Sequence, residues 1–263
     1  MQPIYERWTC APAAVRSAVA GELGREIEYH QAIGSTQDRA RERAAATGVM
    51  AAMLVVVADA QTAGQGTRGR VWHAPAGTAL LASWLFRPAP DEPALVSLLA
   101  GVAVARALDA LGAPGARLKW PNDVLLDDRK LAGVLSHGTS DSSGGTLVLG
   151  IGVNVHQVAA ELPEELRGTA TSLALAGHTV DRLALLVRLT AELDRVAVAG
   201  GRAAALEEWR GRASLLGRAV EVLREGAEPV AGIARDIAED GALVVETAYG
   251  RQRIHAGEVT VTT

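Results

Sequence analysis

A glycine-rich loop that carries two arginines is the first segment of this sequence that could do chemistry. Residues 64–70 read Gly-Gln-Gly-Thr-Arg-Gly-Arg and follow an apolar run that predicts a buried strand. Glycines leave backbone N–H groups accessible, and arginines donate paired hydrogen bonds to carboxylates and phosphates. The loop therefore predicts a site that wraps an anion, with a surface loop bearing two solvated arginines as the alternative.

Two well-known phosphate-binding motifs do not account for this loop. It matches G-x-G-x-x-G, but the dinucleotide-binding fingerprint needs a helix directly after the glycines. Trp72, Pro75 and Gly77 oppose a helix there. A Walker loop is excluded because no Gly-Lys-Ser or Gly-Lys-Thr follows the glycines.

The composition limits the class of protein. The chain has 263 residues, 49% of them hydrophobic and 21% charged, which is typical of a globular protein. A net charge of −4 disfavours a basic stripe for duplex DNA. Cys10 is the only cysteine, which excludes an intrachain disulfide and a cysteine-based zinc site, and the six histidines show no ligand spacing. Without a signal peptide or an apolar run of about 20 residues, we expect a cytoplasmic protein that contacts no membrane.

The elements that must position the loop follow from the hydrophobic pattern. Residues 1–30 are expected to form a short helical segment. The short β-strand runs after Leu216 predict a small β barrel. We therefore expect a domain boundary near Ser214, which divides the chain into domains 1–213 and 214–263. Helices are expected at 35–46, 92–111, 181–198 and 202–212, and strands at 50–58, 79–86, 117–120, 124–126, 131–137 and 146–155.

Three further strings give the sequence a resemblance to a known family. Residues 119–124 read Lys-Trp-Pro-Asn-Asp-Val, residues 129–135 read Arg-Lys-Leu-Ala-Gly-Val-Leu, and residues 150–155 read Gly-Ile-Gly-Val-Asn-Val. With Ser35-Thr36 and the glycine-rich loop, they resemble the biotin protein ligases (biotin–[acetyl-CoA-carboxylase] ligases). The resemblance implies an α+β fold: a central mixed β-sheet with flanking helices, as in class II synthetases, and a C-terminal SH3-like β-barrel.

The resemblance also implies a reaction in two steps. The biotin carboxylate attacks the α-phosphorus of ATP, which gives biotinyl-5′-AMP and pyrophosphate. A lysine of an acceptor then attacks the mixed anhydride and releases AMP. The implied substrates and cofactors are biotin, ATP and Mg²⁺, and the implied partner is the biotin carboxyl carrier domain of a carboxylase, which an exposed strand could host. Whether the chain forms a homodimer stays open.

The candidate residues for catalysis and biotin binding follow. Two anions repel unless a fixed cation lies between them, so Lys119 is the expected central charge, and Arg68 and Arg70 would close over the adenylate. A snorkelling surface lysine is the alternative for Lys119. The Ser35 and Thr36 hydroxyls and the Gln61 amide suit the ureido head of biotin, or else form a helix cap and a loop contact. Resemblance adds a biotin-contacting set: Gln37, Gly64, Gln65, Gly66, Thr67, Gly133 and Gly150.

The candidate ATP site rests on the resemblance in the same way. Trp72 would stack on the adenine, or else is a core residue. Asn154 would reach the nucleotide, and Lys130 would lie near phosphate. Asn122 would contact ATP and Asp123 would bind Mg²⁺, which favours carboxylate oxygens, or the pair forms a β-turn.

Two departures from the family pattern bear on function. Gln65 and Thr67 stand where the family loop, G-R-G-R-x-G-R, commonly has arginine, so we expect biotinyl-5′-AMP to leak faster. Only 34 residues precede Ser35, so we expect a ligase without a DNA-binding repressor domain. A lipoate ligase and a non-catalytic module that binds biotin or adenylate are the rival functions.

Overall fold

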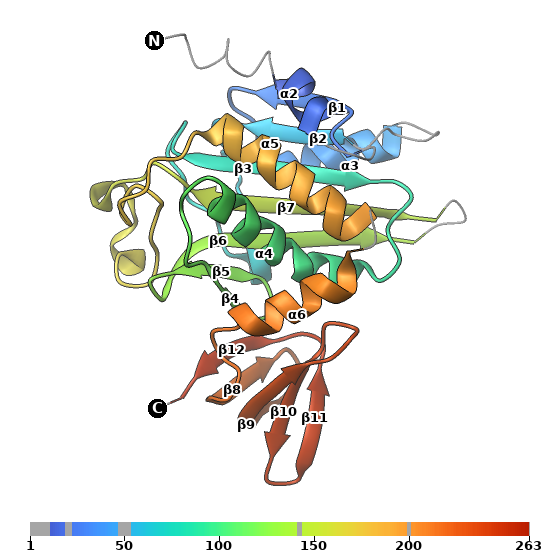
Figure 1. The fold of residues 1–263 in the computed structure, drawn as a ribbon, viewed down its shortest axis with the longest axis vertical. Helices are drawn as coiled ribbons and strands as arrows, with labels where there is room; N and C mark the ends of the chain where they lie inside the picture. The colour runs from blue at the N-terminus through green and yellow to red at the C-terminus, as the bar shows by residue number, and fades with distance from the viewer. Residues whose placement is uncertain (1–10, 19–22, 47–53, 141–143, 199–200, 263) are drawn as a thin grey trace.

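The computed structural model describes residues 11–18, 23–46, 54–140, 144–198 and 201–262 (Figure 1). The described helices are α2 (Ala11–Ala18), α3 (Thr36–Ala46), α4 (Pro93–Ala110), α5 (Arg182–Leu193) and α6 (Arg202–Arg212). Short helical turns occur at Thr67–Gly69, Ala159–Glu161, Glu164–Leu166 and Asp194–Val198. The described strands form one seven-stranded and one five-stranded sheet.

The seven-stranded sheet positions the motifs that resemble the family. Its strands are β1 (Glu26–His30), β2 (Leu54–Ala58), β3 (Ala79–Phe86), β4 (Arg117–Lys119), β5 (Asp123–Leu126), β6 (Arg129–Thr139) and β7 (Thr146–Asn154). Their order is β1-β2-β3-β7-β6-β5-β4, with β1 and β2 parallel and the other neighbours antiparallel. The sheet is therefore mixed, as the family resemblance implied.

Helices cover the two faces of this sheet unequally. The apolar helices α4 and α5 cover one face (Figure 1) and pack with it in the main hydrophobic core, which includes Trp84, Leu99 and Leu189. On the opposite face, α3 packs through Ala40 and Ala44 against a smaller cluster. This second face is only partly covered, and it is the face that holds the candidate site.

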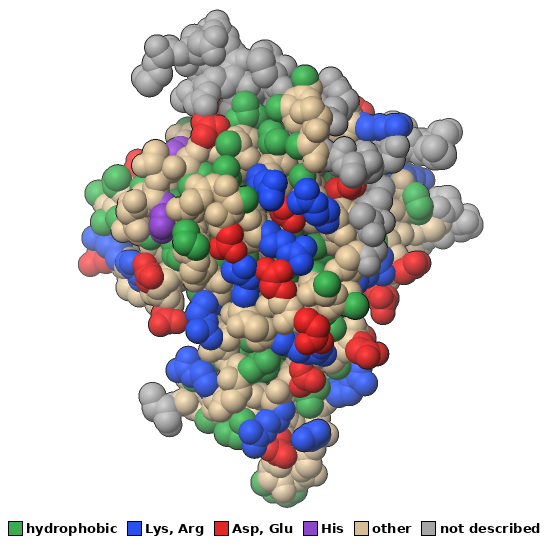
Figure 2. Space-filling model, in the orientation of Figure 1, with side chains coloured by type: hydrophobic (Ala, Val, Ile, Leu, Met, Phe, Trp, Pro, Cys, Tyr) green, Lys and Arg blue, Asp and Glu red, His purple; other side chains and the backbone are tan. Residues whose placement is uncertain are grey.

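The most apolar helix belongs to the core. Among the described residues, α4 is the one helix long and apolar enough to span a membrane, and 67% of it is buried inside the protein. On the outer face of the α4–α6 layer, basic and acidic side chains are interspersed (Figure 2), and several pair with each other, such as Arg106 with Glu208 and Arg212 with Asp109. This face therefore has mixed charge.

The second sheet is open. Its strands are β8 (Ala219–Arg224), β9 (Ala227–Ile237), β10 (Leu243–Thr247), β11 (Gly250–Ile254) and β12 (Glu258–Val261). They are antiparallel in the order β11-β10-β9-β8-β12. The predicted strands are thus confirmed, but in the described part of the chain no pairing joins β11 to β12, so the closed barrel is not seen.

Most of the elements expected from the hydrophobic pattern are confirmed. The strand at 79–86 and the helix at 202–212 have the predicted bounds. The strand predicted at 50–58 is described from Leu54 on, because residues 50–53 lie outside the described part, as does Cys10. The expected helical segment is wrong for residues 26–30, which form β1. This edge strand has only five residues, which alternate charged and apolar side chains and are mostly half-buried. So short a pattern gives only a weak signal for a strand.

A buried ion pair joins the sheet to α5. Arg182, at the start of α5, donates to an Asp59 carboxylate oxygen at 2.7 Å, with side-chain exposures of 8% and 11%. Tyr29 donates its hydroxyl to the other Asp59 oxygen. Burial, together with this hydrogen bond, raises the pKa of Tyr29 well above its usual range. The three side chains tie β1, the end of β2 and α5 together.

Removing the cation of this pair should strongly destabilise the fold. We expect Arg182→Met to lower the free energy of unfolding by about 3–5 kcal/mol, because the Asp59 carboxylate is left buried without its cationic partner. Urea unfolding measures the change. The matched control is Arg253→Met, which breaks an exposed pair with Asp240 at 2.7 Å and should cost less than about 1 kcal/mol. Equal losses in the two variants would contradict the prediction.

Candidate active site

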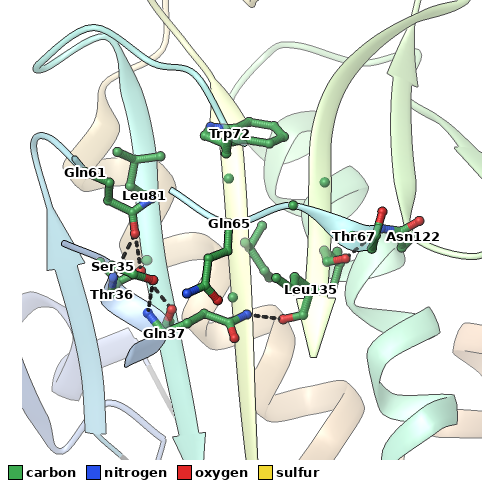
Figure 3. A pocket seen from close by; sticks show the side chains of 18 of the residues that line it. Ser35, Thr36, Gln37, Gln61, Gln65, Thr67, Trp72, Leu81, Asn122 and Leu135 are labelled. Atoms are coloured by element: carbon green, nitrogen blue, oxygen red, sulfur yellow. Dashed lines mark hydrogen bonds between the residues drawn. The ribbon is translucent and has the colours of Figure 1, made fainter. Parts of the chain in front are cut away.

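A cavity lies on the partly covered face of the seven-stranded sheet, between α3, the glycine-rich loop and Trp72 (Figure 3). Its walls come from segments far apart in the sequence. The lining residues are Ser35, Thr36, Gln37, Gln61, Gln65, Gly66, Thr67, Trp72, Leu81, Ala82, Ser83, Asn122, Lys130, Gly133, Val134, Leu135, Gly150, Ile151 and Gly152.

The floor of the cavity consists of two rows across the strands β3, β7 and β6. In the first row, Leu81 pairs with Gly152, which pairs with Gly133 on its other side. In the second row, Ser83 pairs with Gly150, which pairs with Leu135. Alternate residues of a strand point to the same face, so the glycines of β7 both open toward the cavity. Because glycine has no side chain, Gly150 and Gly152 leave room for the cavity.

Two side chains lie directly over this glycine floor. A Cβ atom added to Gly152 would lie 2.7 Å from an indole carbon of Trp72, and one added to Gly133 would lie 3.1 Å from another. A Cβ atom on Gly150 would lie 2.4 Å from Nε2 of Gln37, which donates to the Leu135 carbonyl at 2.5 Å. The glycines thus let Trp72 and Gln37 lie flat along the sheet and form the walls of the cavity.

One end of the cavity is polar and uncharged. The Gln61 side-chain oxygen accepts hydrogen bonds from the backbone and hydroxyl of Thr36, at 2.8 and 3.0 Å. The Thr36 hydroxyl also lies 2.9 Å from the Ser83 hydroxyl. The Ser35 hydroxyl accepts from the Gln37 backbone N–H at 3.2 Å, directly before α3 begins. Ser35 therefore acts as a helix cap and lines the cavity at once.

The opposite end of the cavity carries a cation. Lys130 Nζ lies 5.9 Å from the centre of the Trp72 ring and 2.5 Å from an Asp123 carboxylate oxygen. The Asn122 amide donates to the Val134 carbonyl at 2.8 Å, which fixes its place beside the cavity. An ammonium group, an indole face and a carboxylate thus meet at the β5–β6 side of the sheet.

A cleft adjoins this cationic end. It lies between the glycine-rich loop, residues 119–123 and the start of β12, and it holds Lys119, Arg68 and Arg70 together with Glu258. Both arginines pair with the Glu258 carboxylate, at 2.9 and 3.2 Å. Thr67 and Asn122 line the cavity and the cleft alike, so the two spaces adjoin.

The sequence-based candidates divide between these places. Twelve of them line the cavity: Ser35, Thr36, Gln37, Gln61, Gln65, Gly66, Thr67, Trp72, Asn122, Lys130, Gly133 and Gly150. The expected central cation, Lys119, lies in the cleft with Arg68, Arg70 and Asp123, and the ammonium that lines the cavity is that of Lys130.

Two candidates line neither space. Asn154 is buried, donates to the Thr171 carbonyl at 2.9 Å and accepts from Gln157 at 2.9 Å. Gly64 is buried, and its carbonyl accepts from the Trp72 backbone N–H at 3.0 Å. Asn154 lies behind the wall of the cavity, and Gly64 lines a groove beside it.

Sequence reasoning missed several residues at the site, among them Gly152, Ser83 and Glu258. Gly152 carried a usable signal, because it stands two residues after Gly150 on a predicted strand and must share its face. Ser83 carried a weaker signal, as the one polar residue inside an apolar strand. Glu258 carried none, because 190 residues separate it from Arg68.

Comparison with known proteins shows which protein family this chain resembles. Residues 31–154 match the Biotin/lipoate A/B protein ligase family, and residues 215–261 match the Biotin protein ligase C terminal domain. A biotin–[acetyl-CoA-carboxylase] ligase of Mycobacterium tuberculosis is 36% identical over 252 residues, which cover 91% of this chain and 90% of that protein. The chain belongs to the biotin protein ligase family.

Two other members of this family also match most of this chain. The bifunctional ligase/repressor BirA of Bacillus spizizenii is 31% identical over 249 residues, covering 90% of this chain and 74% of that protein. The biotin protein ligase of Aquifex aeolicus, solved in complex with biotin and ATP, superposes with a TM-score of 0.73 at 28% identity and covers 90% of this chain and 98% of that one. The resemblance inferred from the motifs is confirmed.

The glycines of the cavity floor allow a prediction about ATP binding. We expect Gly152→Ala to raise the KM for ATP about five- to tenfold, because the new methyl group would displace Trp72, which the family resemblance implies stacks on the adenine, and a lost aromatic stacking contact is worth about 1 kcal/mol. Steady-state kinetics measure KM. The control is Gly211→Ala on α6, where an added Cβ meets nothing within 4 Å. An unchanged KM in Gly152→Ala would show that Trp72 does not contact the nucleotide.

Proposed function

We propose that this chain is an ATP-dependent biotin protein ligase that activates biotin as biotinyl-5′-AMP and transfers it to a lysine of the biotin carboxyl carrier domain of acetyl-CoA carboxylase or another carboxylase. The observation that carries the proposal is the polarity of the cavity. A neutral hydrogen-bonding end (Ser35, Thr36, Ser83) leads across an apolar floor to a cationic end (Lys130).

The neutral end suits the ureido head of biotin. An uncharged cyclic urea has N–H donors and a carbonyl acceptor, which hydroxyl and amide groups can match in a pocket that is otherwise apolar. Ser35, Thr36 and Gln61 supply such groups from α3 and the segment after β2. Bound in this direction, biotin would place its valerate chain over Gly150 and Gly152 and its carboxylate toward Lys130.

The cationic end suits the first chemical step. A biotin carboxylate oxygen forms a bond to the α-phosphorus of ATP, the bond from that phosphorus to the bridging oxygen breaks, and pyrophosphate leaves with the electron pair. Both reactants are anions, and a fixed ammonium group stabilises the charge that gathers between them. We assign this role to Lys130, with Trp72 stacking on the adenine and Arg68 and Arg70 facing the phosphates from the cleft.

The second step needs an amine from outside. The neutral lysine of the acceptor attacks the carbonyl carbon of biotinyl-5′-AMP, the bond from this carbon to the phosphate oxygen breaks, and AMP leaves while the amine loses a proton. A groove lined by Gln65, Gly66, Leu135 and His137 shares its first three residues with the cavity and provides a route for that side chain.

Magnesium fits this site through a single carboxylate. Mg²⁺ commonly binds proteins through one or two carboxylates together with substrate phosphates and water. Asp123 lines the cleft, and its carboxylate lies beside Lys130. We propose that Asp123 would hold an ion that arrives with ATP, where the ion would neutralise phosphate charge. The five-stranded sheet, in residues 214–263, is proposed as the SH3-like domain of the family and residues 1–213 as the catalytic domain.

One assay tests the proposed function against its rivals. The protein is incubated with ATP and either biotin or lipoate, and pyrophosphate is measured. The proposal predicts pyrophosphate with biotin only. Release with lipoate only would identify a lipoate ligase, and no release with either would identify a non-catalytic binding module. Transfer is then checked by mass spectrometry of a purified biotin carboxyl carrier domain, which should gain one biotin on one lysine.

A further inference from the structure

The second sheet holds the glycine-rich loop, residues 64–70, through a few contacts. Arg68 donates from one terminal nitrogen to Glu258 at 2.9 Å and from the other to the Leu223 carbonyl at 3.0 Å. Arg70 donates to the second Glu258 oxygen at 3.2 Å. Glu258 on β12 and Leu223 on β8 are direct partners in the register of these strands. One short stretch of the second sheet therefore contacts both arginines.

The backbone of the loop has an unusual conformation at Arg68. Arg68 has φ 57° and ψ 38°, in the left-handed region that few residues other than glycine adopt. Such a conformation persists where the surrounding structure fixes it. The bonds from its guanidinium to Glu258 and Leu223 are contacts of that kind, and they come from the other sheet.

We propose that Glu258 is a positioning residue, which holds the glycine-rich loop closed over biotinyl-5′-AMP by orienting Arg68 and Arg70. The inference rests on the proposed function of the cavity. Each guanidinium has five N–H donors. The contacts with the second sheet use two donors of Arg68 and one of Arg70, so both can bind a phosphate while they stay anchored.

Anchoring matters more in this chain because the loop carries few cations. Gln65 and Thr67 are uncharged, which leaves Arg68 and Arg70 as the two charged residues of the loop. A side chain that is already held in its binding geometry loses less conformational entropy when it binds a ligand. The charge of Glu258 therefore helps both remaining arginines to retain the adenylate.

The test measures how fast bound biotinyl-5′-AMP leaves the protein. The adenylate is formed with labelled biotin and ATP, free ligand is removed, and release is followed by filtration. Glu258→Gln should release it about 3- to 10-fold faster, the effect expected from losing two exposed ion pairs. It should also raise the KM for ATP, leave kcat near the wild-type value and leave the thermal unfolding midpoint unchanged. Glu258→Asp should recover most of the retention.

A matched control and a coupled variant separate positioning from general stability. Glu246 pairs with Arg235 on the same sheet and has the same 41% side-chain exposure as Glu258, so Glu246→Gln should release the adenylate at the wild-type rate. In an Arg68→Ala, Arg70→Ala background, Glu258→Gln should add no further acceleration, because Glu258 acts through those arginines.

Release from Glu258→Gln at the wild-type rate, or more slowly, would overturn the inference. Slower release would mean that Glu258 competes with the phosphate for the arginines. A wild-type protein that forms no adenylate from biotin and ATP would overturn the proposed function, and this inference with it, whereas normal adenylate formation with unchanged release overturns the role of Glu258 alone.

Discussion

Replacing Lys130 with methionine is expected to lower the rate of pyrophosphate release from ATP and biotin by about 100- to 1,000-fold, the usual effect of losing one preorganised group that stabilises developing charge. Lys130 is the ammonium group that lines the cavity, and it lies 5.9 Å from the Trp72 ring centre. Methionine has a similar length and no charge, so it keeps the packing and removes only the electrostatic contribution.

The control for this prediction is Lys119→Met. Lys119 lies in the adjoining cleft, so its loss should slow pyrophosphate release less than the loss of Lys130. Rates are compared at saturating biotin and ATP, after circular dichroism has shown that both variants fold. A large loss in Lys119→Met with a small one in Lys130→Met would support the sequence-based assignment of Lys119 as the central cation, for which Lys119→Ala should abolish adenylation.

The different positions of these two lysines show what a motif can predict. Both belong to strings that resemble the family, and spacing alone does not say which ammonium reaches a shared cavity. The answer depends on where each lysine lies in the sheet. Lys130 lies near the start of β6, and its side chain lies close to Gly133 and Trp72, whereas Lys119 ends the short edge strand β4. Such a difference arises from tertiary contacts that a pattern of residue types does not contain.

Local patterns predicted the elements well where hydrophobic periodicity was strong. The continuous apolar run of β3 and the small, apolar residues of α4 predicted buried elements, and both are buried. The prediction failed at the sheet edge, where β1 alternates Glu26, Ile27 and Glu28 over a short, half-buried strand. Likewise, five β runs and their turns predicted the strands of the second sheet, but whether β11 pairs with β12 depends on long-range register.

Placing arginine at positions 65 and 67 is expected to slow the release of biotinyl-5′-AMP, because two cations common in the family loop are restored. A charge-assisted hydrogen bond contributes about 1–3 kcal/mol, so each effective contact should slow release by about 5- to 150-fold. The wild-type protein should therefore leak the intermediate faster than the Gln65→Arg, Thr67→Arg variant. Trapping of released intermediate by an excess of free amines measures the difference, and Gln252→Arg on the exposed strand β11 is the control for added charge.

The two positions should not contribute equally. The Gln65 side chain donates to both carboxylate oxygens of Asp38, at 3.1 and 3.0 Å, so an arginine there would be drawn into an ion pair with Asp38. Thr67 lines the cavity and the cleft, so an arginine there can reach the phosphate. We therefore expect Thr67→Arg alone to give most of the gain in adenylate retention. Gln65→Arg should increase retention further only when Asp38→Asn removes the competing carboxylate. Equal retention by the wild type and the double variant would mean that Arg68 and Arg70 already hold the adenylate as firmly as a fully charged loop.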